Sequence, residues 1–266
     1  MLEPYYLKDF RARNNPSYCF IFASILHGIA GMAFPMLATT SLAFVMPLSK
    51  VVALVALPSF LMSVLVLCSS NQKGIYQEII YYLKNYKLLA ISSVIGTILG
   101  VKLLLILQVS WLYLLMASIT LYYSINGLLN TYGKVKSIKI NPNDKNMILF
   151  GLLAGIIGGA TNAMSPILLM FLFSQTDDKN RIAKASNLCF LLAKIVQIYM
   201  LKEQYLMLGK SQYALILFLS VFCIVGLYIG IYLRNKISAR LFNTLIFVIL
   251  LILAFKIGYS GILKLI

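Results

Sequence analysis

Long apolar runs separated by short polar connections make up most of the chain. Counted as charge-poor stretches of about 20 residues, the length that crosses a bilayer as a helix, these runs predict eight membrane-spanning helices. The predicted spans are residues 18–44, 50–69, 83–107, 109–132, 147–173, 183–202, 211–233 and 239–262. The pattern therefore predicts an all-α, polytopic helical membrane protein.

Two of the predicted spans, the first and the fifth, contain glycine and proline near their middle. The stretch 151–171 is apolar enough for lipid, yet it combines Pro166 with four glycines, Gly151, Gly155, Gly158 and Gly159. Both residue types weaken the interior of a helix. Within a bilayer, an interrupted backbone is tolerated only where protein or a water-filled cavity satisfies its polar groups. We therefore expect this helix to break near the middle of the membrane, beside a cavity.

The same landmarks recur in both halves of the chain at an offset of 130 or 131 residues. They are Gly28 with Gly159, Pro35 with Pro166, Lys50 with Arg181, Gly96/Gly100 with Gly226/Gly230, and Gly127 with Gly258. We predict two repeats of four segments, each opening with a broken helix. Repeats with four true crossings would be parallel and repeats with an odd number would be inverted, and the sequence leaves both open. The predicted division is an N-terminal polar segment 1–17, a first membrane repeat 18–132, a polar linker 133–146 and a second membrane repeat 147–266.

The composition agrees with a membrane protein and removes one class of partner. Hydrophobic residues make up 61% of the chain and charged residues 11%, against about 25% charged residues in soluble domains. The net charge of +16 is scattered singly between apolar runs, which favours contact with anionic lipid head groups over binding to nucleic acid. With eight spans, thirteen Lys and Arg residues lie on the side of the termini and eight on the other. This excess favours cytoplasmic termini, but a segment that doubles back would move every later loop to the opposite side.

No catalytic or metal-binding signature accompanies the spans. The sequence has one histidine and seven carboxylates, and we expect all seven carboxylates in the N-terminal segment or in connecting loops. No His, Cys, Asp and Glu cluster has metal-ligand spacing, and no nucleophile elbow or P-loop occurs. The sequence therefore predicts a protein that is not an enzyme and that needs no metal or other cofactor.

The broken helices have the chemistry to bind an anion. Broken helices expose N–H groups at their N-terminal ends, where the helix dipole is positive, and glycine allows the backbone to approach an oxyanion closely. The candidate residues at the second break are Gly158, Gly159, Thr161, Asn162 and Ser165. Their glycines have an alternative role in tight helix packing, which is the role that we predict for Gly96/Gly100 and Gly226/Gly230.

Lys194 is the most informative single residue. It lies about ten residues from either end of the run 183–202 and shares a helix face with Asn187. A charge at that depth costs a few kcal/mol or more unless it is paired or hydrated. Our hypothesis is that both residues help to hold the anion; the alternative is that Lys194 snorkels or binds free carbonyls. Gly31 and His27 complete the candidate set at the first break, where His27 either couples transport to protons or caps the backbone.

Taken together, these motifs resemble the sulfite exporter TauE/SafE family. The resemblance rests on the two glycine-containing segments that end in proline, the basic residue near the start of the helix that follows each of them, and the Gly-x3-Gly helix later in each half. It extends over residues 18–261, although the first half keeps only Gly28 and Gly31 of the glycine-rich run. The resemblance implies a multi-pass permease of the bacterial inner membrane that moves small sulfur-containing or organic anions.

The sequence thus predicts a secondary transporter, an exporter or permease of small anions such as sulfur oxyanions, sulfonates or organic acids, that works by alternating access. Its expected partners are a small anionic solute and membrane lipids. Coupling to a proton or a sodium ion stays open, as does a homodimer. The alternatives are a permease for cations or neutral solutes, and a membrane assembly or biogenesis factor that transports nothing.

Overall fold

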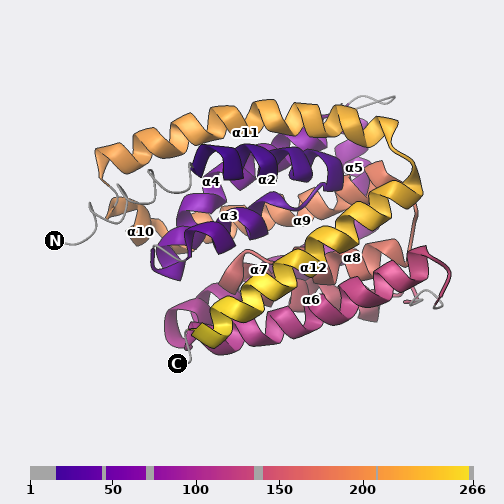
Figure 1. Cartoon of the computed structure of the whole chain (residues 1–266), viewed down its shortest axis with the longest axis horizontal. Helices are drawn as coiled ribbons and strands as arrows, with labels where there is room; N and C mark the ends of the chain where they lie inside the picture. Colours follow the sequence, from indigo (N-terminus) through magenta and orange to yellow (C-terminus); the bar gives the residue numbers. More distant parts are fainter. Residues whose placement is uncertain (1–15, 44–45, 70–74, 135–139, 208, 264–266) are drawn as a thin grey trace.

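A computed structural model describes residues 16–43, 46–69, 75–134, 140–207 and 209–263, and within these residues every regular element is a helix (Figure 1). The helices are α2 (Pro16–Ala30), α3 (Phe34–Leu42), α4 (Leu48–Cys68), α5 (Ile75–Ile106), α6 (Val109–Thr131), α7 (Asp144–Thr161), α8 (Ser165–Phe173), α9 (Lys179–Met200), α10 (Lys202–Leu206), α11 (Lys210–Lys236) and α12 (Ala239–Leu263). In the described part of the chain, four helices are long and apolar enough to cross a membrane, namely Leu48–Cys68, Tyr76–Ile106, Lys179–Met200 and Ala239–Leu263. The prediction of a helical membrane protein is confirmed. Most of the predicted N-terminal segment 1–17 and the middle of the linker 133–146 lie outside the described residues.

Both predicted helix breaks are present. The first separates α2 from α3 at residues 31–33, and the second separates α7 from α8 at residues 162–164. Each contains a residue in the left-handed region, Gly31 with φ of 80° and Asn162 with φ of 63°. Proline follows in the first turn of the next helix, Pro35 in α3 and Pro166 in α8, where its missing N–H costs no hydrogen bond. Local sequence thus determines where each helix stops and restarts.

The two broken segments double back, an arrangement that the sequence had left open beside the count of eight spans. Phe150 near the start of α7 and Phe171 near the end of α8 have ring centroids 5.7 Å apart. The Gln175 side chain, just beyond α8, donates a 2.7 Å hydrogen bond to the Ile140 carbonyl, just before α7. The α7/α8 segment is therefore a helical hairpin whose two outer ends lie at the same end of the bundle. In Figure 1, α2 and α3 form a second hairpin that opens toward the other end, where both chain termini lie.

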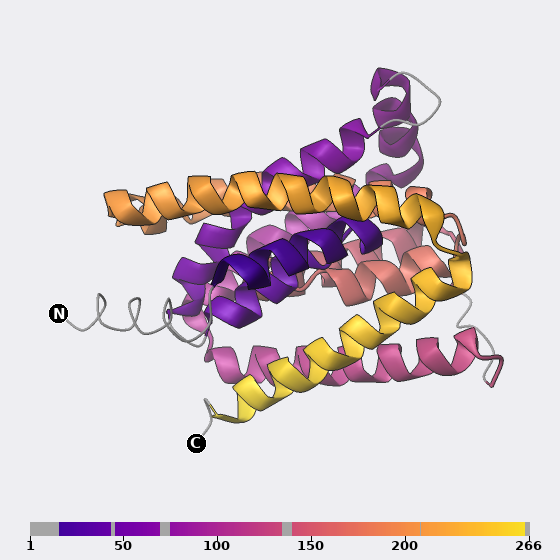
Figure 2. The same cartoon turned by 45° about the horizontal axis from the view of Figure 1, so that its top comes forward.

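Each hairpin packs against a helix from the other half of the chain. The helix α11 lies along α2, and α5 lies along α7, while α12 pairs with α6 and α4 with α9 (Figures 1 and 2). Glycines make the closest contacts: a Cβ built on Gly28 would lie 2.6 Å from the Gly230 Cα, and one built on Gly159 would lie 3.1 Å from the Gly100 Cα. The predicted role of the Gly-x3-Gly pairs in helix contact is confirmed.

Three carboxylates that we expected in loops lie in helices instead, Asp144 in α7, Glu203 in α10 and Glu78 in α5. The helix α5 begins eight residues before the predicted span, so Glu78 lies in its first turn, where the helix dipole favours a carboxylate. Its carboxylate forms an ion pair with Lys184 of α9. The helix extends through polar residues that the apolar pattern excludes, and it bends at Tyr86, whose backbone is not helical.

Candidate functional site

Lys194 lies where the tip of the α7/α8 hairpin meets α9. Its side chain is only 2% exposed. Its Nζ donates hydrogen bonds to the Asn162 Oδ1 at 2.5 Å and to the Gln197 Oε1 at 2.7 Å. Asn162 caps α7 in the left-handed conformation, which asparagine tolerates better than most residues. The break in the backbone therefore aims an amide oxygen at a buried ammonium group.

The amide nitrogen of the same Gln197 side chain binds the last turn of α7. The Gln197 Nε2 donates to the carbonyls of Gly158 (3.0 Å) and Gly159 (3.2 Å) and to the Asn162 Oδ1 (3.0 Å). Carbonyls in the last turn of a helix lack partners within it, so this side chain serves as a cap for the Gly159 carbonyl, while the Gly158 carbonyl also accepts from the Asn162 N–H at 2.9 Å. Gly158 and Gly159, which we expected to offer N–H groups to an anion, offer their carbonyls to Gln197, and Gly159 also packs closely on α5.

Hydrogen bonds connect the tips of the two hairpins. The Asn162 Nδ2 donates to the Thr39 Oγ1 at 2.8 Å, and the Ser165 hydroxyl donates to the Met32 carbonyl at 2.8 Å. The Asn187 Nδ2 donates to the Gly31 carbonyl at 2.5 Å. Residues 123 or more apart in sequence thus meet at one place, and the structure brings most of the predicted candidates together there.

Two predicted candidates occupy more peripheral positions. The Thr161 hydroxyl donates to the Ile157 carbonyl of its own helix at 2.7 Å. The fully buried His27 accepts a 3.4 Å hydrogen bond at Nδ1 from the Phe34 N–H, so the neutral ring carries its proton on Nε2. The Asn187 side chain is the hydrogen-bond partner that faces the His27 ring, and the His27 Nε2 and the Asn187 Oδ1 have no further partner among the described residues. The first break therefore connects His27 to Asn187.

The network carries a positive charge that no carboxylate balances. Both acceptors of the Lys194 ammonium are neutral amide oxygens. Within the described ranges, the ion pair that the structure shows joins Lys184 and Glu78 instead. Burying a charge without a counter-ion is costly, so an anion at this place would gain the Coulomb energy that the protein itself does not supply. In the same part of the chain, no group of three or more His, Cys, Asp and Glu side chains could hold a metal ion.

Three further polar residues have weak or no signal in the sequence. Gln197 lies at the edge of the helix face that carries Lys194, and its sequence position indicates no function of its own. Thr39 had no signal, because its counterpart in the second repeat is Met170. Arg234 was assigned to a loop because it ends an apolar run. The structure instead buries it to 1% exposure in the last turn of α11, with Nε and Nη1 unpaired among the described residues.

Comparison with known proteins supplies one match. Residues 18–257 match the family described as Sulfite exporter TauE/SafE. No curated protein and no solved structure matches the chain.

Proposed function

Because the chain belongs to the sulfite exporter TauE/SafE family of membrane permeases, we propose that it is a secondary transporter of small anions that works by alternating access. The anion would be a sulfur oxyanion, a sulfonate or a small organic acid. The location would be the bacterial inner membrane, crossed several times by the chain.

The observation that carries this proposal is the unbalanced charge of Lys194 at the meeting point of the hairpin tips. An anion bound beside it would complete the charge pair. The N-terminal ends of α3 and α8 would contribute a favourable dipole from both halves, although the Phe34 N–H already donates to His27 and Pro35 and Pro166 have no N–H. We propose Asn162, Ser165, Asn187 and Lys194 as the groups that surround the anion.

The arrangement of the hairpins supports inverted repeats. Each half consists of one hairpin followed by three long helices, α4, α5 and α6 in the first half and α9, α11 and α12 in the second. In each half, the same long helix packs along the first helix of the other half's hairpin: α11 packs along α2, and α5 packs along α7. We infer that these six helices cross the membrane and that the hairpins enter it from opposite sides. Rocking of one half against the other around a central site is the usual motion of such transporters.

This topology reverses the expected orientation. Among the described residues, the end where the α7/α8 hairpin opens then holds ten basic residues, Lys84, Lys87, Lys134, Lys145, Lys179, Arg181, Lys184, Arg234, Lys236 and Arg240. The end where the α2/α3 hairpin opens holds four, Lys50, Lys102, Lys202 and Lys210. Since basic residues favour the cytoplasmic side, we infer that the loops α6–α7, α8–α9 and α11–α12 face the cytoplasm.

A flux assay tests the proposed function. The purified protein is reconstituted in proteoliposomes and supplied with sulfite, sulfate, thiosulfate, a sulfonate or acetate, with and without sodium and proton gradients. We expect at least one of these anions to enter faster than in protein-free vesicles, and the same anion to raise the melting temperature in detergent. Transport of cations or neutral solutes with no anion flux would refute the proposal, as would a stoichiometric protein partner in a preparation that transports nothing.

Asn162→Asp tests the role of the unbalanced charge. The new carboxylate would occupy the position that already accepts from Lys194, and the Thr39 hydroxyl can donate to its second oxygen. We expect the fold to persist, since aspartate also tolerates the left-handed backbone. Anion flux should fall about 10–100-fold because the ammonium is neutralised internally. The matched control is Asn85→Asp on the exposed face of α5; equal flux in both variants would contradict the prediction.

A further inference from the structure

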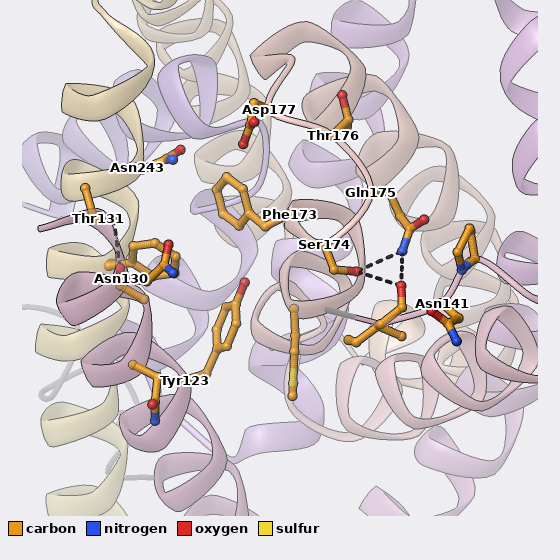
Figure 3. A pocket seen from close by; sticks show the side chains of 16 residues that line it. Tyr123, Asn130, Thr131, Asn141, Phe173, Ser174, Gln175, Thr176, Asp177 and Asn243 are labelled. Carbon is orange, nitrogen blue, oxygen red and sulfur yellow. Dashed lines mark hydrogen bonds between the residues drawn. The ribbon is translucent and has the colours of Figure 1, made fainter. Parts of the chain in front are cut away.

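A second polar region lies away from the hairpin tips, at the end of the bundle where the α7/α8 hairpin opens. It is a pocket of about 640 Å³ between α6, α8, α12 and the linker before α7 (Figure 3). Carboxamides and hydroxyls surround it, including Asn126, Asn130, Thr131, Gln175, Thr176 and Asn243. Among the described residues, its one lining carboxylate, Asp177, is exposed, and no lysine or arginine of that part of the chain lines it. The pocket therefore offers many neutral hydrogen-bond donors and no fixed cation.

A much smaller, separate cavity lies beside the hairpin tips. It has a volume of about 10 Å³, roughly enough for one water molecule. Met32 and Ala33 of the first break line it together with Ser165 of the second break. Two helices line both cavities: α8 contributes Leu169 to the small cavity and Met170 to the pocket, and α12 contributes Ile246 and Phe247 in the same way. One layer of side chains thus separates the pocket from the meeting point of the tips.

Aromatic rings fill that separating layer. Phe173 of α8 and Phe247 of α12 have ring centroids 5.4 Å apart, and Tyr123 of α6 lies 5.5 Å from Phe247. The Phe247 ring lies directly against Gly127, where a Cβ would collide with it. Rings can rotate and separate when packed helices shift by small amounts, so this layer can open without unfolding a helix.

We propose that this pocket, the polar vestibule, is the entrance through which the anion reaches the hairpin tips, and that Phe173 and Phe247 form the closed seal below it. The proposal rests on the proposed function. Amide N–H and hydroxyl donors bind an oxyanion or carboxylate without the strong attraction of a buried cation, so the anion can move on toward Lys194. The volume falls in the range of pockets that hold small solutes. The basic residues at this end of the bundle raise the local anion concentration.

The donors that α6 gives to the polar vestibule are not repeated in α12, its counterpart in the second half. The positions 131 residues after Asn126, Asn130 and Thr131 are Ile257, Gly261 and Ile262, so the corresponding place in the other repeat is apolar. The entrance at the opposite membrane face therefore cannot use the same donors. We expect the vestibule to bind and release the anion on one side of the membrane alone.

Cysteine labelling tests this proposal. In a background with the four native cysteines replaced by alanine, Asn243→Cys places a thiol in the vestibule wall. Thr244→Cys, the matched control, is one residue away on the same helix and is not part of the vestibule lining. The probe is a bulky, charged, membrane-impermeant methanethiosulfonate reagent, added to either side of vesicles of defined orientation. Asn126→Cys with Ile125→Cys as its control repeats the test from α6 if either α12 variant fails to fold.

The expected result has three parts. The vestibule cysteine reacts from the side that carries the α6–α7 and α8–α9 loops and from no other side, the transported anion slows this reaction, and the modified protein loses flux relative to the same variant before modification. Modification of the control cysteine leaves the flux unchanged. A fully modified vestibule cysteine with undiminished anion flux would overturn the entrance while leaving the proposed function intact. Absence of anion flux in the unmodified wild-type protein would instead refute the proposed function.

Discussion

Lys194→Met is expected to reduce anion flux by about 100-fold or more, because loss of a buried charge partner costs at least 2–5 kcal/mol. Methionine keeps the length and apolar character of the stem and removes only the ammonium group. The Gln197 amide would still donate to the Asn162 Oδ1 and to the last carbonyls of α7. One acceptor, the Gln197 Oε1, would lose its donor, at a cost of about 1–3 kcal/mol in stability. Flux in proteoliposomes and the melting temperature in detergent separate the two effects.

Lys256→Met is the matched control. Lys256 also lies in an apolar helix, α12, but its Nζ donates to the Ser41 hydroxyl at 3.1 Å, at the end of α3 away from the hairpin tips. Removing this charge should leave anion flux within about a factor of two, because the residue lies outside the proposed site. A Lys194→Met protein that melts normally and transports normally would refute the proposed site. A loss of flux in both variants would assign the effect to membrane charge in general.

The sequence predicted the breaks but not the direction of the chain after them. Glycine, asparagine and proline at residues 31–35 and 162–166 act through local backbone preference, which is readable without the fold. Whether the second helix continues outward or returns depends on contacts such as Phe150 with Phe171, which are set by tertiary packing. The apolar pattern is the same for a crossing helix and for a buried hairpin. The count of eight spans and the expected orientation both followed from that ambiguity.

The proposed site was also predictable from the sequence only in part. Lys194 and Asn187 were visible because a charge and a carboxamide inside an apolar run require an explanation. The second function of Gln197, as a cap for α7, depends on a neighbour more than 35 residues away in sequence. The polar vestibule gave no sequence signal, since its lining comes from the ends of separate helices and from the linker, where polar residues are ordinary. Arg234 was misplaced for the same reason, because an arginine at the end of an apolar run normally marks a membrane boundary.

Gly28→Ala is expected to lower the stability of the protein by about 1–3 kcal/mol, the usual cost of overpacking. The added methyl group would lie 2.6 Å from the Gly230 Cα and 2.8 Å from the Ile231 N, which are backbone atoms that cannot rotate away. Alanine alone would favour the helix by about 0.5–1 kcal/mol, so the clash must exceed that gain for the prediction to hold. Thermal unfolding in detergent measures the difference. Gly258→Ala is the control, since its Cβ would meet the Ala117 Cβ at an ordinary 3.4 Å.

The reciprocal variant shows whether the α2–α11 contact causes the loss. A Cβ on Gly230 would lie 2.7 Å from the Gly28 Cα, so Gly230→Ala should destabilise the protein by a similar amount. Once either methyl group has forced the helices apart, the second has more room, and the double variant should lose less stability than the two single losses together. Additive losses would mean that each glycine acts within its own helix. Because α2 ends at the first break, separation of α2 from α11 should also move Gly31 away from Asn187, so anion flux should fall together with stability, whereas Gly258→Ala should retain both.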